Sequence, residues 1–250
     1  MGKNYILITI AALFLTCFAI KEGLAETYST NFTLTEDPIS EGGRWINGKT
    51  DGGDWSDCAT NGSYVYGKMV TSSNYNDDTC ILTGTWGTNQ TAFGTIYSNV
   101  DGGATGEEEA EIRLLSSIIR GENKGYEILI DLNRNNGYGI QIVRWNGPRG
   151  DYDILTSGNV ATGKTGDVLK GTSVVTANSV TIRAYVNDRL IATAVDSSAS
   201  RITSGNPGIG FYKNSYNGNN YDVGFTVYYA TDGISEPAIP EPPKNLHVVD

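Results

Sequence analysis

The sequence predicts an all-β fold, a sandwich of two antiparallel sheets, from three observations. The chain of 250 residues holds 31 glycines and 15 tyrosines but only 2 methionines, a composition that favours strands and turns over helices. Apolar and polar residues alternate with period two in many short segments. Those segments are joined by connections rich in glycine and asparagine, which tolerate a positive φ.

The clearest part of this pattern lies between Glu109 and Asn146, which we interpret as three successive antiparallel strands: Glu109–Ile119, Tyr126–Leu132 and Tyr138–Trp145. Alternation along the first strand places an apolar face opposite a charged face. The apolar face carries Ile112, Leu114 and Ile118, and the charged face carries Glu109, Glu111 and Arg113. An antiparallel sheet with only one side on the core shows this pattern.

The rest of the chain offers further short strands with turn residues between them. We expect strands at Tyr28–Leu34, Ser63–Val70, Cys80–Trp86, Gln90–Asn99, Asp151–Leu155, Asp167–Thr176, Ser179–Val186, Arg189–Val195, Gly208–Lys213 and Val223–Tyr229. Thr35–Gly53 and Ser72–Asp78 are expected to be loops. About a dozen short strands indicate one sandwich, because a β-domain of about 200 residues is of ordinary size.

The two ends of the chain differ from this pattern. Met1–Lys3 carries a charge, and Tyr5–Ile20 is an apolar run shorter than the roughly 20 residues of a membrane span. Gly23 and Ala25 supply small residues before Glu26, so we predict a signal peptide over 1–25, with an uncleaved anchor as the alternative. The sandwich domain then spans 26–232 and a proline-rich tail spans 233–250.

Charge and export restrict the partners. The formal net charge is −10, which argues against nucleic acid and anionic membranes. We expect no membrane insertion after signal cleavage, and a location that is secreted, periplasmic or at the cell surface. An acidic exported protein suits neutral poly- or oligosaccharides or cations as ligands.

Several short signatures resemble the concanavalin A-like lectin/glucanase superfamily, which includes LamG-like jelly rolls. They are Phe32-x-Leu34, Pro38–Trp45, Gly125–Ile128, Val180–Ala192 and Gly205–Phe211, and the resemblance covers roughly Thr27–Tyr229. It implies a jelly roll with a convex and a concave sheet. It also implies that glycans bind on the concave sheet or on its rim loops.

Glu109-x-Glu111-x-Arg113 is the first candidate for chemistry, because alternation puts all three side chains on one strand face. Two carboxylates in one site can divide the roles of acid and base. Hydrolases of the superfamily carry an aspartate between paired acids on one strand, and this sequence departs from that pattern at Glu111 and Arg113. The alternative is a solvated strand face on which Arg113 forms a salt bridge.

Alginate-lyase-like members of the superfamily suggest a second candidate. Glu111-Ile-Arg113, Gln141 and Phe211–Tyr216 resemble their Arg-bearing strand, Gln/His pair and late tyrosine motif. Val143 stands where the histidine is wanted, and the single histidine of the chain lies in the tail. If the protein is an enzyme, a lyase or hydrolase on the concave sheet, the residues that the sequence offers are Glu111, Arg113 and Tyr212.

Aromatic side chains can serve as platforms for sugar rings. Trp145 ends a predicted strand, and Tyr216 and Tyr221 lie in a polar loop, so we expect these three to face solvent. With Gln141 as a polar partner they are the predicted carbohydrate-binding residues. A packing role is the alternative for each aromatic residue, because such side chains bury large areas.

Two further features concern ions and cysteines. Two oxygen-rich loops suit a structural calcium, one with Asp51, Asp54 and Asp57 and the other Asn76–Asp78, with a plain acidic turn as the alternative. We expect no other cofactor. Signal cleavage leaves Cys58 and Cys80, which an exported protein would pair as a disulfide, unless both stay as buried thiols.

These observations lead to one main hypothesis and two others. The first is an exported, non-catalytic, carbohydrate-binding β-sandwich module. The second is a polysaccharide lyase or glycoside hydrolase acting on the concave sheet. The third is a structural or adhesive surface domain without a sugar ligand.

Overall fold

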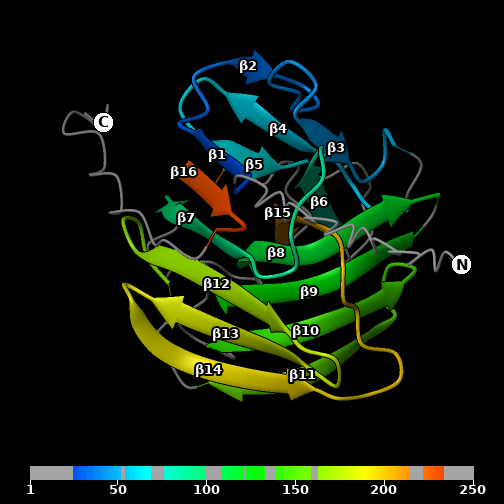
Figure 1. Ribbon diagram of the computed structural model, residues 1–250. Coiled ribbons are helices and arrows are strands. Elements are labelled where there is room, and N and C mark those ends of the chain that lie inside the picture. The colour runs from blue at the N-terminus through cyan, green and yellow to red at the C-terminus, as the bar shows by residue number, and fades with distance from the viewer. Residues whose placement is uncertain are drawn as a thin grey trace, which may run out of the picture.

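The computed structural model describes residues 25–51, 54–68, 76–99, 108–120, 122–132, 139–158, 163–213 and 222–233. Across these ranges the chain forms strands and connections only, in two antiparallel sheets that pack face to face (Figure 1). The predicted all-β sandwich is confirmed. No helix in the described ranges is long and apolar enough to cross a membrane.

The predicted signal peptide and the proline-rich tail lie almost wholly outside the described residues. Of the predicted signal peptide only Ala25 is described, and of the proline-rich tail only Gly233. Tyr216 and Tyr221 also lie outside the described residues.

One sheet has nine strands. Its main path runs in the order β14 (Arg189–Asp196), β13 (Val180–Val186), β12 (Val168–Val175), β7 (Thr91–Ser98), β16 (Val223–Thr231), β5 (Val65–Gly67), β4 (Cys58–Asn61) and β2 (Thr35–Glu36). The ninth strand, β1 (Thr27–Thr30), pairs with β16, so the first and last described strands lie side by side.

The second sheet has seven strands and contains the predicted three-strand meander. Its order is β11 (Tyr152–Gly158), β10 (Ile140–Gly147), β9 (Glu122–Asp131), β8 (Glu108–Ile119), β15 (Asn206–Lys213), β6 (Asn76–Leu82) and β3 (Trp45–Asn47). Strands β8 to β11 are consecutive in sequence and adjacent in the sheet, as Figure 1 shows in green. We call the side of this sheet that points away from the nine-stranded sheet its outer face.

The main hydrophobic core fills the space between the two sheets. Ile112 and Leu114 of β8 are fully buried there, as their alternation predicts. They pack in one cluster with Leu169 and Ile182 of the opposite sheet. In the seven-stranded sheet, a side chain that alternates with such core residues therefore projects from the outer face. This alternation determines which residues can form a site on that face.

Strand β8 departs from simple alternation at its far end. Its register with β9 shifts between Leu114 and Ser117, and Leu115 has a φ of +51°. This β-bulge turns Leu115 into the core next to Leu114. Ile118, which the alternation places in the core, is only half-buried because the bulge intervenes.

Two segments expected as loops contain strands. β2 and β3 lie within Thr35–Gly53, and β6 begins at Asn76, inside the expected loop Ser72–Asp78. Strands of two or three residues are too short to show alternation. The polar start of β6 pairs with β15, so Asp77 enters the sheet and contributes a carboxylate to its outer face.

Candidate functional site

A pocket of about 240 Å³ hollows the outer face of the seven-stranded sheet. Along β8, β9, β10 and β15, every second side chain points away from the core, and these side chains line the pocket. We call it the outer pocket. Its lining residues are Asp77, Glu109, Glu127, Leu129, Gln141, Val143, Trp145, Tyr152, Ile154 and Tyr212.

The rim of the outer pocket combines polar and apolar side chains. Glu109 and Tyr212 are direct cross-strand neighbours on β8 and β15, and both are half-buried. Gln141 on β10 is also half-buried. At the opposite side, Tyr152 and Ile154 of the edge strand β11 are 42% and 52% exposed. An aromatic and an aliphatic side chain therefore stand in solvent beside hydrogen-bonding groups.

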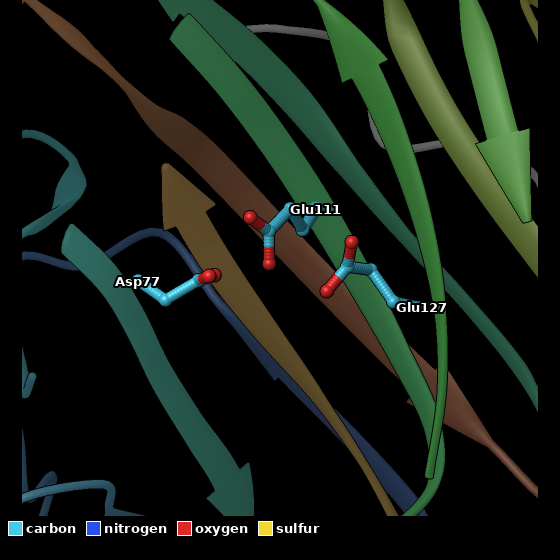
Figure 2. A group of neighbouring side chains, drawn as sticks. All are labelled: Asp77, Glu111 and Glu127. Carbon is cyan, nitrogen blue, oxygen red and sulfur yellow. The ribbon is translucent and has the colours of Figure 1, made fainter. Parts of the chain in front are cut away.

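Three carboxylates gather on this side of the sheet, two of them in the lining of the pocket, and Figure 2 shows the three side chains pointing toward one another. Asp77, Glu111 and Glu127 come from β6, β8 and β9, and one oxygen of each lies within 4.8 Å of the others. All three residues are at most 3% exposed. Such a concentration of buried negative charge is unstable unless a cation or protons compensate it.

Arg113 supplies that cation. Its Nη2 lies 2.5 Å from Glu111 Oε2 and 3.7 Å from Asp77 Oδ1, and its Nη1 lies 2.5 Å from Glu127 Oε2. The guanidinium is thus set among the three carboxylates, with a side chain only 1% exposed. We call Asp77, Glu111, Arg113 and Glu127 the buried ionic group.

Two tryptophans cover the buried ionic group. The Arg113 guanidinium lies 4.9 Å from the ring centre of Trp55 and 5.8 Å from that of Trp145, within the range of cation–π attraction. The two rings meet edge-on at 4.4 Å, and Trp145 Nε1 donates a hydrogen bond of 2.6 Å to Glu127. With Leu129 and Val143 the tryptophans form a second, smaller hydrophobic cluster. The tryptophan rings therefore cover Arg113, while Asp77 and Glu127 also line the outer pocket.

Burial and charge set the protonation of this group. Burial raises the pKa of Glu111 well above its usual range, against the opposing effect of Arg113, and the charges of Glu127 and Asp77 add to the rise. Burial alone would lower the pKa of Arg113, but the charges of Glu111, Glu127 and Asp77 outweigh it and raise the pKa. The arginine stays charged, while Glu111 is the carboxyl most prone to hold a proton.

Gly210 leaves the space that the ions need. It lies opposite Glu111 in the pairing of β15 with β8. A Cβ at this position would lie 2.3 Å from Glu111 Oε2 and 2.7 Å from Arg113 Nη2. Any side chain at Gly210 would therefore push against the ion pair.

These positions change the interpretation of the predicted catalytic residues. Glu111 and Arg113 do form a salt bridge, but they do not lie on a solvated strand face, since Trp55 and Trp145 cover that face. A polysaccharide in the outer pocket cannot contact either group in this arrangement. Tyr212 does line the pocket, and its neighbour there is Glu109.

Only some of the predicted sugar-binding residues that the structure describes are exposed to solvent. Gln141 and Trp145 both line the outer pocket, but Trp145 is only 3% exposed and does not face solvent as expected. Trp55 and Tyr152 pack against its ring, at 4.4 Å and 4.8 Å between ring centres. The exposed aromatic of the pocket is Tyr152, which is not among the predicted binding residues. Tyr152 and Ile154 stand two residues apart in β11 and are both exposed.

The aspartates of the predicted calcium loop do not come together. Asp51 accepts a hydrogen bond from the backbone N–H of Asn47, and Asp54 accepts one from that of Arg149. Asp57 is buried and accepts from two backbone N–H groups and a hydroxyl of the preceding loop. Each carboxylate thus fixes a different part of the backbone. Within the described ranges, the carboxylates that converge are those of the buried ionic group.

Cys58 and Cys80 lie on opposite sheets, in β4 and β6, and meet in the core. Both are free thiols in the structure and are completely buried, and burial raises the pKa of each. The disulfide predicted between them is not formed here and remains a prediction.

Comparison with known proteins adds information on the fold. No protein-family model matches the sequence, and no curated protein matches it. Among solved structures, a mutant of the Emp46p carbohydrate recognition domain aligns with a TM-score of 0.53 at 14% identity, over 83% of this chain and 97% of that one. The VIP36 exoplasmic/lumenal domain in a Ca²⁺/Man-bound form aligns with 0.50 at 10% identity, over 85% and 94%.

A third solved structure is the CBM2 module of the evolved Dit of Lactobacillus casei BL23 phage J-1. It aligns with a TM-score of 0.50 at 8% identity, over 83% of this chain and 95% of that one. At such identities the likeness concerns the fold alone. The chain has the concanavalin A-like jelly-roll fold that its sequence signatures indicate.

Proposed function

We propose that this chain is an exported, non-catalytic module that binds carbohydrate in the outer pocket. The observation that carries the proposal is the lining of that pocket. Exposed Tyr152 and Ile154 offer a flat apolar surface for the C–H face of a sugar ring. Gln141, Glu109 and Tyr212 offer groups that can hydrogen-bond to sugar hydroxyls across from it.

The floor of the pocket supports binding over catalysis. Glu111 and Arg113, the groups with the most altered acid–base properties near the pocket, lie beneath Trp55 and Trp145. A general acid or base has to reach the reacting atoms within hydrogen-bonding distance. The buried ionic group instead fixes the tryptophans and the strands, which keeps the pocket shape constant before a ligand arrives.

Structural neighbours lend further support. One of them is a carbohydrate recognition domain, and another is a lumenal domain in a form bound to Ca²⁺ and mannose. Export is proposed from the charged, apolar and small-residue pattern of 1–25. A Cys58–Cys80 disulfide would then join the two sheets after export. A structural calcium stays part of the proposal, although Asp51, Asp54 and Asp57 do not converge on one site.

The test is a polysaccharide panel with purified residues 26–250, with and without calcium. Retention on one class of polysaccharide, without new reducing or unsaturated ends, is the result that the proposal predicts. Loss of retention on chelation would support the calcium, and a 2 Da mass increase on reduction would support the disulfide. Failure to bind any member of a broad panel would favour a structural or adhesive surface domain.

A polysaccharide lyase or hydrolase is the second candidate, and one observation favours it. Glu109 and Tyr212 are direct neighbours across β8 and β15, and both line the pocket. A carboxylate beside a phenol can act as a proton-transfer pair. New chain ends in the panel that disappear in a Tyr212→Phe variant would establish this function and overturn the non-catalytic one.

A further inference from the structure

A second hollow of about 480 Å³ lies at one end of strands β9 to β11, and the proposed function does not use it. We call it the end hollow. Charged, amide and hydroxyl groups surround it, with apolar carbon between them. Such a mixed lining suits a polar ligand better than an apolar one. The described residues that line it are Lys124, Arg144, Trp145, Asn146, Asp151, Asp153, Ser200 and Ile202.

The end hollow and the outer pocket lie on opposite faces of the same strands. Trp145 borders both cavities. The other side chains of β10 and of 151–154 divide between the two by alternation, since successive side chains of a strand point to opposite faces. Those in the outer pocket are Gln141, Val143, Tyr152 and Ile154, and those in the end hollow are Arg144, Asn146, Asp151 and Asp153.

Arg144 holds the walls of the end hollow together. Its side chain is only 9% exposed, and its Nη1 and Nη2 lie 2.8 Å from Asp196 and 2.5 Å from Asp153. Its Nε donates to Asn146 at 3.2 Å, and Nη1 also donates to Ser198 at 2.7 Å. These bonds join β10 to β11 and to the connection that follows β14. The cavity is therefore formed before a ligand arrives, which lowers the cost of binding.

The exposed groups of the end hollow keep hydrogen-bonding capacity for a ligand. Arg144 and Asn146 both donate to Oδ2 of Asp153, whose side chain is 51% exposed. An ionised carboxylate offers about four acceptor positions, so Asp153 can accept further bonds. Lys124 pairs with Glu122 at 2.8 Å, and its ammonium group carries further N–H donors. Donors beside acceptors match sugar hydroxyls, because each hydroxyl both donates and accepts.

The edge strand β11 separates the two cavities. It is the last strand of its sheet in the described part of the chain. Tyr152 and Ile154, which line the outer pocket, are 42% and 52% exposed, and Asp153 between them is exposed on the other face. Consecutive Cα atoms are only about 3.8 Å apart. A ligand seated on Tyr152 can therefore pass over the edge of β11 and reach Asp153.

We infer that the outer pocket and the end hollow are two subsites of one site, which takes a polysaccharide chain bent over the edge of β11. This inference rests on the proposed function, since the outer pocket is the first subsite. One sugar packs its apolar face on Tyr152, and a later sugar of the same chain sets its hydroxyls against Asp153 and Lys124. A disaccharide fills one subsite only, so the preferred ligand is a long, flexible chain.

The test measures how affinity depends on the length of the ligand. Mannose, glucose and xylose oligomers, each as a disaccharide and as an octasaccharide, are titrated into residues 26–250 by isothermal calorimetry. Two subsites on one ligand chain reinforce each other, because the second contact forms at a high effective concentration. We expect the octasaccharide of the bound class to bind about a hundredfold more tightly than its disaccharide.

A blocking variant connects this gain to the end hollow. Ser200 lines the hollow and is exposed, so Ser200→Trp should fill the cavity. It should remove most of the gain of the octasaccharide and leave the affinity of the disaccharide unchanged. Ser63→Trp is the matched control, because Ser63 is exposed between β4 and β5 of the other sheet. It should change neither affinity.

A second variant decides the matter if Ser200→Trp fails to fold in a thermal melt. Lys124→Ala removes a donor from the end hollow and should weaken the octasaccharide a few-fold but not the disaccharide. Lys68→Ala is its control, because Lys68 pairs with Asp37 at the surface as Lys124 pairs with Glu122. It should leave both affinities unchanged.

The possible failures are distinct. Equal affinity for the disaccharide and the octasaccharide would overturn the inference and leave a carbohydrate-binding function in place. A gain with length that both end-hollow variants retain would also overturn it, since the longer chain would then bind elsewhere. No binding of any of these oligosaccharides would count against the proposed function and the inference together.

Discussion

Replacing Arg113 by methionine should destabilise the fold more than any single surface change. The substitution keeps an unbranched side chain but leaves Asp77, Glu111 and Glu127 buried without their cation. Breaking a buried ion pair by removing one partner costs about 3–5 kcal/mol. The free energy of unfolding of a domain is about 5–15 kcal/mol, so the variant should be close to its stability limit at neutral pH.

The pH dependence gives this prediction its specific signature. Arg113 opposes the raised pKa of Glu111, so without the arginine burial and the neighbouring carboxylates raise that pKa further above its value in the unfolded chain. Groups with a raised folded pKa favour folding when protonated, so the stability of the variant should increase as the pH falls from 7 toward 5. The wild type, with its guanidinium in place, should show a much smaller increase.

Urea unfolding followed by tryptophan fluorescence measures both effects, since Trp55 and Trp145 report on the covered face. Arg44→Met is the matched control. Its ion pair with Glu26 is 42% exposed on both sides, and such pairs contribute under about 1 kcal/mol. The structural role of the buried ionic group would be refuted if Arg113→Met lost no more free energy of unfolding than this control. It would also be refuted if the variant gained no stability on mild acidification.

Three other predictions follow from the same contacts. Calcium should restore part of the stability of Arg113→Met in a thermal melt but not affect the wild type, because three carboxylate oxygens lie within 4.8 Å. Gly210→Ala should cost about 1–3 kcal/mol in urea unfolding, since its Cβ would lie 2.3 Å from Glu111, and an unchanged midpoint would contradict this. Burial would raise the pKa of Asp196, but hydrogen bonds from Ser198 and Arg144 outweigh it and lower the pKa to about 2. Stability should therefore fall by about 2 kcal/mol as pH drops from 4 to 2, and Asp196→Asn should flatten this acid limb of the curve.

The sheet around β8 to β10 was predictable because each strand there is long and alternates clearly. Ile112 and Leu114 do enter the core, and Glu111 and Arg113 do lie on the other face. Alternation identifies which residues share a face, and it carries no information about what covers that face. It therefore could not show that Glu111 and Arg113 are buried.

The cover itself comes from distant parts of the chain. Trp55 stands in a connection before β4 and packs on Trp145 of β10, about 90 residues later. No local pattern in the sequence links positions so far apart. Nor does any local pattern link Asp77 to Glu111 and Glu127, since Asp77 lies in a segment expected to be a loop. The exposure of Tyr152 could have been predicted, since Tyr152 and Ile154 stand two residues apart in a short strand and so share one face, on which both are exposed.

The most direct test of the central claim is the affinity of Tyr152→Ala for the glycan that wild type binds best, measured by calorimetry. Leu190→Ala is the control, because Leu190 is 51% exposed on β14 of the other sheet. Loss of an aromatic contact of about 1 kcal/mol predicts a drop in affinity of about fivefold for Tyr152→Ala and none for the control. Undiminished binding by Tyr152→Ala would show that the sugar site lies elsewhere on the molecule.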